Sequence, residues 1–379
     1  MYFDATIRPM ATLYFHIPFC KRICSYCDFY KVGAVELLPR VVEMMHRELD
    51  QRQSYLLSKS LTSIYFGGGT PSLLAPEDIE ALIAHARRIF DCSQVDEITI
   101  EANPDDLTEE YVERLKLTSV NRVSLGVQSF DDEVLRFMNR RHSADDAERA
   151  VERLRSAGIA NISVDIIFGV AGFGDDHLYN SLRRAIALDV EHISAYHLTI
   201  EERTRLGLLM RKGEYTPVSE ERSEEEFLAV HNALVEAGYD HYEVSNFAKA
   251  GCRAKHNSAY WSGVEYLGIG AGAHSFSGDN RTWCTSTAKE YSEGKFSFDE
   301  EQLTELDHLN EYVMTQLRTS QGIDLEYVAV RYGEREAKRL LSSAELWVAS
   351  GAMQHSANRL VIPSDRFLLS DAIIESLFA

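Results

Sequence analysis

Short apolar runs alternate along the first half of the chain with longer segments whose hydrophobic residues recur at helical spacing. Alternation of this kind is typical of a parallel sheet with helices packed on its outer face. The pattern predicts six strands, at 12–16, 63–66, 97–101, 122–128, 162–168 and 192–200. It predicts helices between them at 36–55, 76–90, 108–116, 144–157 and 176–188. Six strands are too few for a closed eight-stranded barrel, so we expect an α/β fold with a partial (β/α)6, TIM-like barrel.

The helix at 144–157 carries signals at both ends. Ser143 stands just before it and Asp146 follows three residues later, which is the spacing of a capping box. Gly158 occupies the position after the helix, where glycine commonly ends a helix.

The pattern changes after residue 240. Segment 241–300 is rich in glycine, alanine and aromatic residues, and we expect it to link the barrel at 1–240 to a further domain. From residue 301 the sequence predicts three helices, two short apolar runs at 359–362 and 367–369 that form a hairpin, and a last helix. This order predicts a small winged-helix-like domain at 301–379. Its 12 acidic and 7 basic residues favour a packing or partner-binding role over DNA binding.

Composition and charge narrow the class of protein. The chain has 379 residues, of which 45% are hydrophobic, which excludes a wholly disordered protein. Its net charge of −20 repels phosphate backbones, so we expect no nucleic-acid partner. No apolar run has the length of a membrane helix, which predicts no membrane anchor. Residues 1–10 lack a signal-peptide pattern, so the expected location is the cytoplasm.

Three of the six cysteines lie together directly after the first predicted strand. Cys20, Cys24 and Cys27 have the spacing C-x3-C-x2-C, whereas the other three are scattered and are interpreted as small hydrophobic residues or spare thiols. Three thiolates can each bind one iron of a [4Fe-4S] cluster and leave the fourth iron open. An open iron can chelate S-adenosylmethionine (SAM), and an electron from the cluster can then cleave the sulfonium to give a radical.

Zinc is the alternative for the same cysteines. A structural zinc site has four ligands, frequently as two pairs of cysteines, and no second pair is present. His16 is a possible fourth ligand, but it precedes the cysteines on the strand. The spacing therefore favours the cluster.

Polar residues recur at the ends of successive predicted strands. In a barrel-like α/β fold these ends carry the chemistry, although each such residue alone is also a normal strand end facing water. Glu101, Gln128 and Asp165 are candidates to bind the methionine amino group or the ribose of SAM, and Arg140 to pair with a carboxylate. Three glycines, 67–69, follow the second strand and allow close approach of the backbone to a ligand.

Several strings along the chain resemble one known family, the radical SAM proteins related to oxygen-independent coproporphyrinogen III oxidase. They are HIPFCKRICSYCDFY (16–30), GGGTPS (67–72), EANP (101–104), GVQSF (126–130), SVDIIFGV (163–170), HISAYHLTIE (192–201), YEVSNFAK (242–249), HNSAYW (256–261) and GIGAGAHSF (268–276). Within the family the chain is most similar to the heme chaperone branch. Phe29 stands where the oxidase has a further cysteine, only 19 residues precede Cys20, and HNSAYW matches the H-N-x-x-Y-W string that the family associates with heme.

The resemblance implies a set of cofactor residues, with no catalytic residue assigned. The cluster ligands are Cys20, Cys24 and Cys27. The SAM contacts are Tyr14, Gly68, Gly69, Thr70, Glu101, Gln128, Arg140 and Asp165. The heme residues are His256, Asn257, Tyr260 and Trp261, although the residues alone equally describe a packed loop.

The resemblance also implies a function and its alternatives. The expected function is a radical SAM heme chaperone that passes heme to an acceptor, such as a respiratory membrane protein. The first alternative is an oxidase of porphyrin biosynthesis that converts coproporphyrinogen III to protoporphyrinogen IX. The second alternative is another radical SAM reaction, such as heme breakdown or methyl transfer. Two residues depart from the branch, namely Asn139 where glycine is usual and Ala171 where proline is usual.

Overall fold

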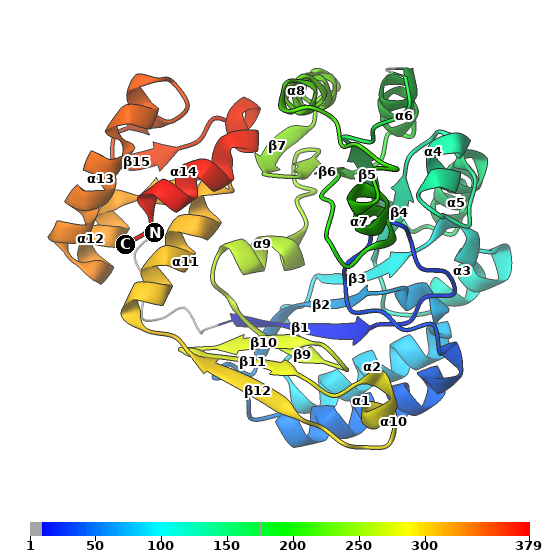
Figure 1. Cartoon of the computed structure of the whole chain (residues 1–379). Coiled ribbons are helices and arrows are strands. Elements are labelled where there is room, and N and C mark those ends of the chain that lie inside the picture. The colour runs from blue at the N-terminus through cyan, green and yellow to red at the C-terminus, as the bar shows by residue number, and fades with distance from the viewer. Residues whose placement is uncertain (1–9, 175) are drawn as a thin grey trace.

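The computed structural model of the chain describes residues 10–174 and 176–379. Residues 1–9, on which the signal-peptide expectation rests, lie outside the described residues. The largest element is a sheet of 12 strands in the order β12-β11-β10-β9-β1-β2-β3-β4-β5-β6-β8-β7. Figure 1 shows this sheet curving around an inner side, with most of its helices on the outer side.

The six predicted strands are confirmed, and they lie side by side in chain order, all parallel. They are β1 (Met10–Ile17), β2 (Ser60–Gly68), β3 (Glu97–Ala102), β4 (Arg122–Gln128), β5 (Asn161–Phe168) and β6 (His192–His197). The alternating directions of the side chains along β1 explain why this segment forms a strand of the sheet. Phe15 is buried and its ring stacks on that of Phe66 of β2, with centroids 4.7 Å apart, whereas Tyr14 and His16 face the inner side. The predicted end of the sixth strand was wrong: β6 stops at His197 and not at residue 200.

The predicted helices between the strands are also confirmed, and several shorter helices join them. The set is η1 (Val35–Leu37), α1 (Leu38–Arg52), η2 (Pro71–Leu73), α2 (Pro76–Ile89), η3 (Pro104–Asp106), α3 (Glu109–Leu115), α4 (Asp132–Phe137), α5 (Ala144–Ser156) and α6 (Asp176–Ala187). The capping box at Ser143 and Asp146 is present, and Gly158 has a φ of +89°.

The second half of the chain adds strands to both edges of the sheet. Its elements are α7 (Arg205–Arg211), α8 (Glu220–Glu236), β7 (Asp240–Glu243), β8 (Asn246–Ala248), α9 (Lys255–Trp261), β9 (Glu265–Ile269), β10 (His274–Ser277), β11 (Asn280–Cys284), α10 (Ala288–Ser292) and β12 (Phe298–Gln302). β9 pairs in parallel with β1, whereas β8 lies antiparallel beside β6. The domain limits at residues 240 and 300 stay predictions.

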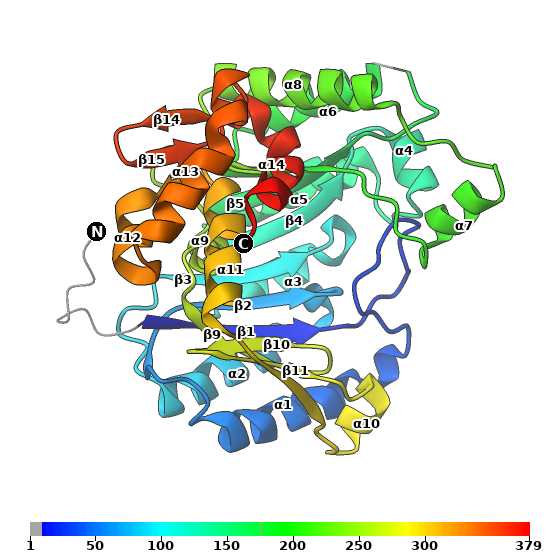
Figure 2. The same cartoon turned by 60° about the vertical axis from the view of Figure 1, so that its left-hand side comes forward.

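The chain ends in a group of helices with a small antiparallel sheet of order β13-β15-β14. Its elements are α11 (Glu305–Leu317), β13 (Ile323–Asp324), α12 (Leu325–Tyr332), α13 (Glu334–Ala349), β14 (Gln354–Ser356), β15 (Arg359–Val361), η4 (Ser364–Leu369) and α14 (Ser370–Leu377). Figure 2 shows this group beside the open side of the sheet. The predicted hairpin was wrong in one strand: β15 pairs with β14, and 367–369 belongs to η4, where Phe367 packs into the core.

Among the described residues, no helix is both long enough and apolar enough to cross a membrane.

Candidate functional site

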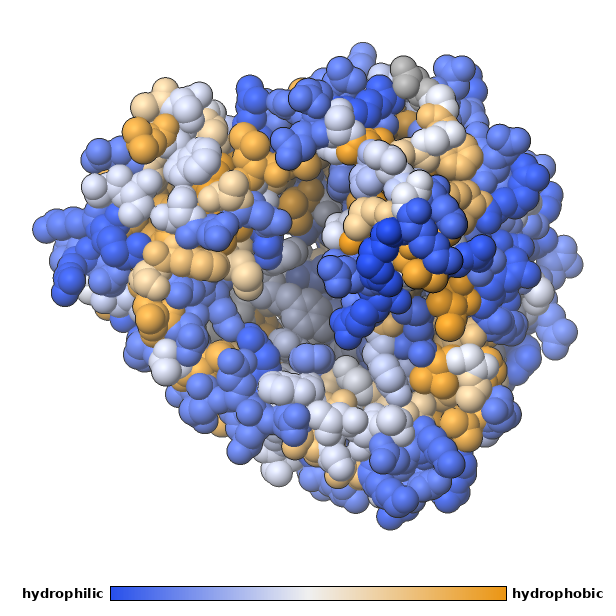
Figure 3. All heavy atoms as spheres, in the orientation of Figure 1, coloured by the Kyte–Doolittle hydropathy of each residue, from blue (hydrophilic) through white to orange (hydrophobic). Residues whose placement is uncertain are grey.

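A cavity of about 620 Å3 opens at the carboxyl ends of the parallel strands. Figure 3 shows that the face of the molecule turned to the viewer is hollowed near its centre. The cavity brings together the predicted cluster ligands and all but one of the predicted SAM contacts. They are Cys20, Cys24, Cys27, Gly68, Gly69, Thr70, Glu101, Gln128, Arg140 and Asp165. Residues from five of the strands and the loops that follow them therefore meet at one site, as the strand-end pattern predicts.

The three cysteines lie on the loop between β1 and η1, and backbone bonds fix this loop at its base. The Cys20 N–H donates to Val32 O at 3.0 Å and the Val32 N–H to Pro18 O at 2.7 Å. Further along, the Ser25 N–H donates to Met138 O, just after α4. The cysteine loop is therefore held against two separate parts of the barrel.

Polar donors surround the cysteine sulfurs and the loop. Thr70 Oγ1 donates to Cys20 Sγ at 3.4 Å, and Arg140 Nη1 donates to Cys24 Sγ at 3.3 Å. Burial raises the pKa of the Cys20 and Cys27 thiols, so these groups lose their protons readily only when a metal binds them. Donors of this kind stabilise thiolate ligands and tune the potential of an iron–sulfur cluster.

The arrangement fits a cubane cluster better than a zinc ion. Within residues 10–174 and 176–379, no three His, Cys, Asp or Glu side chains are placed to share one metal ion. A cubane gives each thiolate an iron of its own, so the three cysteines need only face one cavity. When bound there, the cluster supplies an electron and an open iron for SAM.

The glycines after β2 act mainly on the cysteine loop. The Gly69 N–H donates to Ile17 O at 2.9 Å, and a Cβ on Gly69 would lie 2.8 Å from that oxygen and from Pro18 C. Gly68 has a φ of +110°, and its Cβ would meet the His16 ring at 2.8 Å. The close backbone approach expected from the sequence is thus present, and it is made to the end of β1 and the start of the cysteine loop.

Replacing Gly69 by alanine is expected to lower the free energy of unfolding by about 1–3 kcal/mol, because the new methyl group overlaps backbone atoms that cannot rotate away. The displaced cysteine loop should also hold less iron after reconstitution. Gly33→Ala is the matched control, since a Cβ there meets nothing within 4 Å. Chemical denaturation and iron analysis of both variants measure the effect; equal behaviour would contradict the assigned role of Gly69.

Two carboxyl groups in the cavity titrate near neutral pH. Glu101, on β3, accepts a hydrogen bond from the Tyr65 hydroxyl at 2.9 Å and one from the Gly68 N–H at 3.0 Å. Burial raises its pKa to about 7, and the nearby Asp165 adds to the shift. Burial also raises the pKa of Asp165 to about 6. Ionised, both groups can accept hydrogen bonds from an ammonium or from hydroxyl groups.

Hydrogen bonds anchor Arg140 on the side of the cavity where the cysteine loop lies. Besides Cys24, its guanidinium donates through Nη2 to Asn103 Oδ1 at 2.6 Å and to Gly126 O at 2.5 Å. Its Nε is buried without a partner. Arg140 therefore ties Cys24 to Gly126 of β4 and to Asn103, the residue before η3, and it lines the same cavity as Glu101. Gln128 ends β4 with a φ of +70°, a backbone conformation that non-glycine residues adopt rarely and that is concentrated at functional sites.

Sequence reasoning missed several cavity residues, among them Asn103, Ser124 and Tyr196. Asn103 stands two positions after Glu101 in the string EANP. Its place directly after a predicted strand, next to a predicted site residue, was a signal that could have identified it. Ser124 donates to Asp165 Oδ1 at 3.4 Å, a cross-strand contact that needs the register of β4 and β5.

The two departures from the family pattern have structural explanations. Asn139 has a φ of +60°, which asparagine tolerates nearly as glycine does, and its Nδ2 donates to Ile23 O of the cysteine loop at 2.7 Å. The Ala171 N–H donates to the Tyr215 hydroxyl at 3.0 Å, a bond that proline lacks the hydrogen to make.

Tyr14 and the predicted heme residues lie outside the lining of the cavity. The Tyr14 hydroxyl lies 3.0 Å from His16 Nδ1, on the inner face of β1. His256 is 1% exposed; its Nδ1 lies 2.8 Å from Ser63 Oγ, and its Nε2 lies 3.1 Å from the Tyr260 hydroxyl. In this conformation both ring nitrogens of His256 are occupied, and burial lowers its pKa to about 3.

Helix α9, which carries these heme residues, packs between the sheet and the C-terminal group. The buried Glu97 carboxylate accepts hydrogen bonds from the Lys255 and His256 N–H groups, both at 2.9 Å. At the other end of the helix, Trp261 O accepts a hydrogen bond from Gln316 Nε2 of α11 at 2.8 Å. Asn257 and Trp261 are partly exposed, beside this contact.

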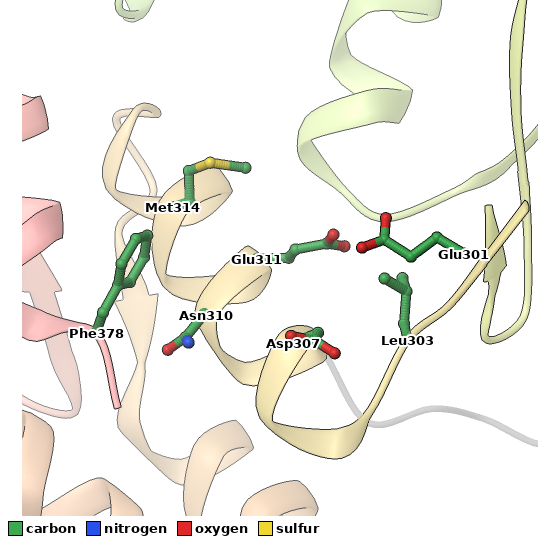
Figure 4. A pocket seen from close by; sticks show the side chains of 7 residues that line it. All are labelled: Glu301, Leu303, Asp307, Asn310, Glu311, Met314 and Phe378. Atoms are coloured by element: carbon green, nitrogen blue, oxygen red, sulfur yellow. The ribbon is translucent and has the colours of Figure 1, made fainter. Parts of the chain in front are cut away.

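A smaller cavity of about 140 Å3 lies between β12 and α11 (Figure 4). None of the predicted site residues lines it. Its acidic groups already have partners: Glu311 accepts from Arg281, and Asp307 caps α11 through Thr304. It is therefore separate from the cofactor site.

Comparison with known proteins agrees with this site. A sequence profile of the radical SAM superfamily matches residues 14–185. A Bacillus subtilis protein named heme chaperone HemW is 36% identical over 362 residues, which cover 93% of this chain and 94% of the relative. The Escherichia coli protein of the same name is 34% identical over 70% of each chain.

A solved structure shares the fold of nearly the whole chain. Coproporphyrinogen III oxidase (HemN) from Escherichia coli, a radical SAM enzyme, superposes with a TM-score of 0.82 at 20% identity, covering 99% of this chain and 92% of the enzyme. This likeness confirms the predicted fold class.

Proposed function

Because this chain belongs to the heme chaperone HemW family of the radical SAM superfamily, we propose that it binds heme and passes it to an acceptor protein. The observation that carries the proposal is the identity of 36% and 32% to two proteins named heme chaperone HemW, over 93% and 96% of this chain. The family implies a [4Fe-4S] cluster and SAM, and the cysteine cavity supplies residues for both.

We assign the cluster to Cys20, Cys24 and Cys27. The proposed SAM site consists of the other predicted residues that line the cavity, together with Tyr14. We propose that Glu101 accepts hydrogen bonds from the amino group of SAM; its position in the lining of the cavity supports this role. Arg140 donates to Cys24 Sγ and lines the same cavity. Three free thiols must stay reduced to take up iron, and this need supports a location in the reducing cytoplasm.

The proposed acceptor is a heme-requiring respiratory membrane protein. The test is to load the reconstituted holoprotein with heme and mix it with heme-depleted respiratory membrane vesicles. Heme should move to the vesicles faster than it moves to apomyoglobin, which scavenges heme that dissociates by itself. Equal rates would contradict chaperone activity. Conversion of coproporphyrinogen III to protoporphyrinogen IX under reducing, anaerobic conditions would instead establish the oxidase.

Replacing His256 by alanine is expected to change the absorption spectrum or affinity of bound heme. The imidazole is a good iron ligand, and a bound iron would replace one of its two ring contacts, either that of Nε2 with the Tyr260 hydroxyl or that of Nδ1 with Ser63 Oγ. A heme titration of the variant measures this. His355→Ala is the control, because His355 lies in the exposed strand β14, far along the chain from this helix. A titration identical to that of the native protein would contradict the assignment of His256.

A further inference from the structure

One tyrosine contacts both the proposed SAM cavity and the H-N-x-x-Y-W helix. Tyr65 lies on β2, and its hydroxyl donates to Glu101 Oε1, which faces the cavity. The ring of the same tyrosine stacks on the His256 ring, with centroids 4.8 Å apart and planes at 24°. Tyr65 thus lies between Glu101 of the cavity and His256 of α9.

The side chains on each side of Tyr65 are themselves held in place. Glu101 is fixed on its other oxygen by the Gly68 N–H, within the glycine turn. His256 is fixed by Ser63 and Tyr260, and α9 in turn contacts α11 through Trp261. A displacement of the Glu101 carboxylate therefore reaches α9 through one hydrogen bond and one ring contact.

We propose that Tyr65 is a positioning residue that couples ligand binding in the cavity to the H-N-x-x-Y-W helix. A ligand ammonium beside Glu101 keeps this carboxylate ionised, and an ionised carboxylate accepts a stronger hydrogen bond from the Tyr65 hydroxyl. The fixed tyrosine ring then holds His256 and the helix more firmly. This inference rests on the proposed function insofar as it takes SAM as the cavity ligand.

Hydrogen–deuterium exchange of the reconstituted, cluster-bearing protein tests the coupling. Saturating SAM should slow exchange in a peptide covering 254–264, which contains α9. Tyr65→Phe keeps the ring on His256 but lacks the hydroxyl, so SAM at a concentration scaled to the affinity of the variant should no longer slow exchange there. Tyr55→Phe is the matched control, because its hydroxyl donates to Asn280 O on β11, which β9 and β10 separate from β1. In that variant the effect of SAM should persist.

A second measurement tests whether a change on α9 alters SAM binding in the cavity, because a coupling between two sites is reciprocal. His256→Ala removes the ring that rests on Tyr65 and should weaken SAM binding about fivefold or more, whereas His256→Phe should restore most of the affinity by restoring the stack. Equal SAM slowing of α9 in Tyr65→Phe and in the native protein, or an unchanged SAM affinity in His256→Ala, would overturn the proposal. If the native protein did not bind SAM at all, the proposed SAM site would be wrong and the coupling with it, whereas heme transfer would stand on its own test.

Discussion

Cys24→Ala is expected to abolish cluster binding. With Cys20 and Cys27 alone, two irons of the cubane lose a protein ligand or remain open, and two thiolates do not retain a cluster that needs three. The same change removes the sulfur that Arg140 contacts, so a buried guanidinium is left with fewer acceptors. Native protein reconstituted under anaerobic conditions should contain about four irons per chain, and the variant close to none.

Cys252→Ala is the matched control for this experiment, since Cys252 lies outside the cavity and its thiol makes a long contact of 3.8 Å to the carbonyl of Ala250. It should retain full iron and sulfide. Circular dichroism should show the same secondary structure in both variants, which separates loss of the cluster from loss of the fold. A Cys24→Ala protein with native iron content, or zinc in place of iron in the native protein, would contradict the assignment.

Glu101→Gln is expected to weaken SAM binding by about 10- to 100-fold, the range for a lost hydrogen bond to a charged group. The amide carries no charge, and its NH2 group faces either the Tyr65 hydroxyl or the Gly68 N–H, both of which are donors. Equilibrium dialysis with labelled SAM measures the affinity. Glu152→Gln, which changes an exposed carboxylate on α5, is the control and should bind SAM normally.

The Glu101 carboxyl group also predicts that the affinity for SAM depends on pH. Since its pKa is raised to about 7, Glu101 is protonated below that pH and ionised above it. SAM affinity of the native protein should therefore rise between pH 6 and pH 8, and the rise should be smaller in Glu101→Gln. An equally steep rise in both proteins would assign the titration to another group.

Periodicity was sufficient to predict the six parallel strands and the helices between them because each strand has buried neighbours on both sides. Buried parallel strands are apolar along most of their length, and this gives a strong signal. The strand-end residues followed from the same reasoning, because parallel strands bring their carboxyl ends to one edge. Glu101, Gln128 and Asp165 come from three strands and line one cavity.

The strands that the second half of the chain adds on either side of the six parallel strands could not be predicted in this way. All five residues of β12, Phe-Asp-Glu-Glu-Gln, are exposed, so the strand has no apolar face to detect. β9 contains Gly268, whose Cβ would lie 2.1 Å from His274 O, so packing demands a residue that disfavours strands. The same limit applies to Tyr65 and His256: their contact joins residues nearly 200 positions apart and depends on where α9 enters the barrel.

The parallel pairing of β1 with β9 affects how the protein forms during synthesis. β1 leads directly into the cysteine loop, and one of its two hydrogen-bonding edges stays open until residues 265–269 have left the ribosome. Gly270 then packs against the carbonyl of His16, close to the start of that loop. Long-range pairing of this kind is slow compared with local helix formation. Iron–sulfur assembly factors should thus meet a fully formed cysteine loop only after residues 265–270 have left the ribosome, which places cluster loading late in synthesis or after it.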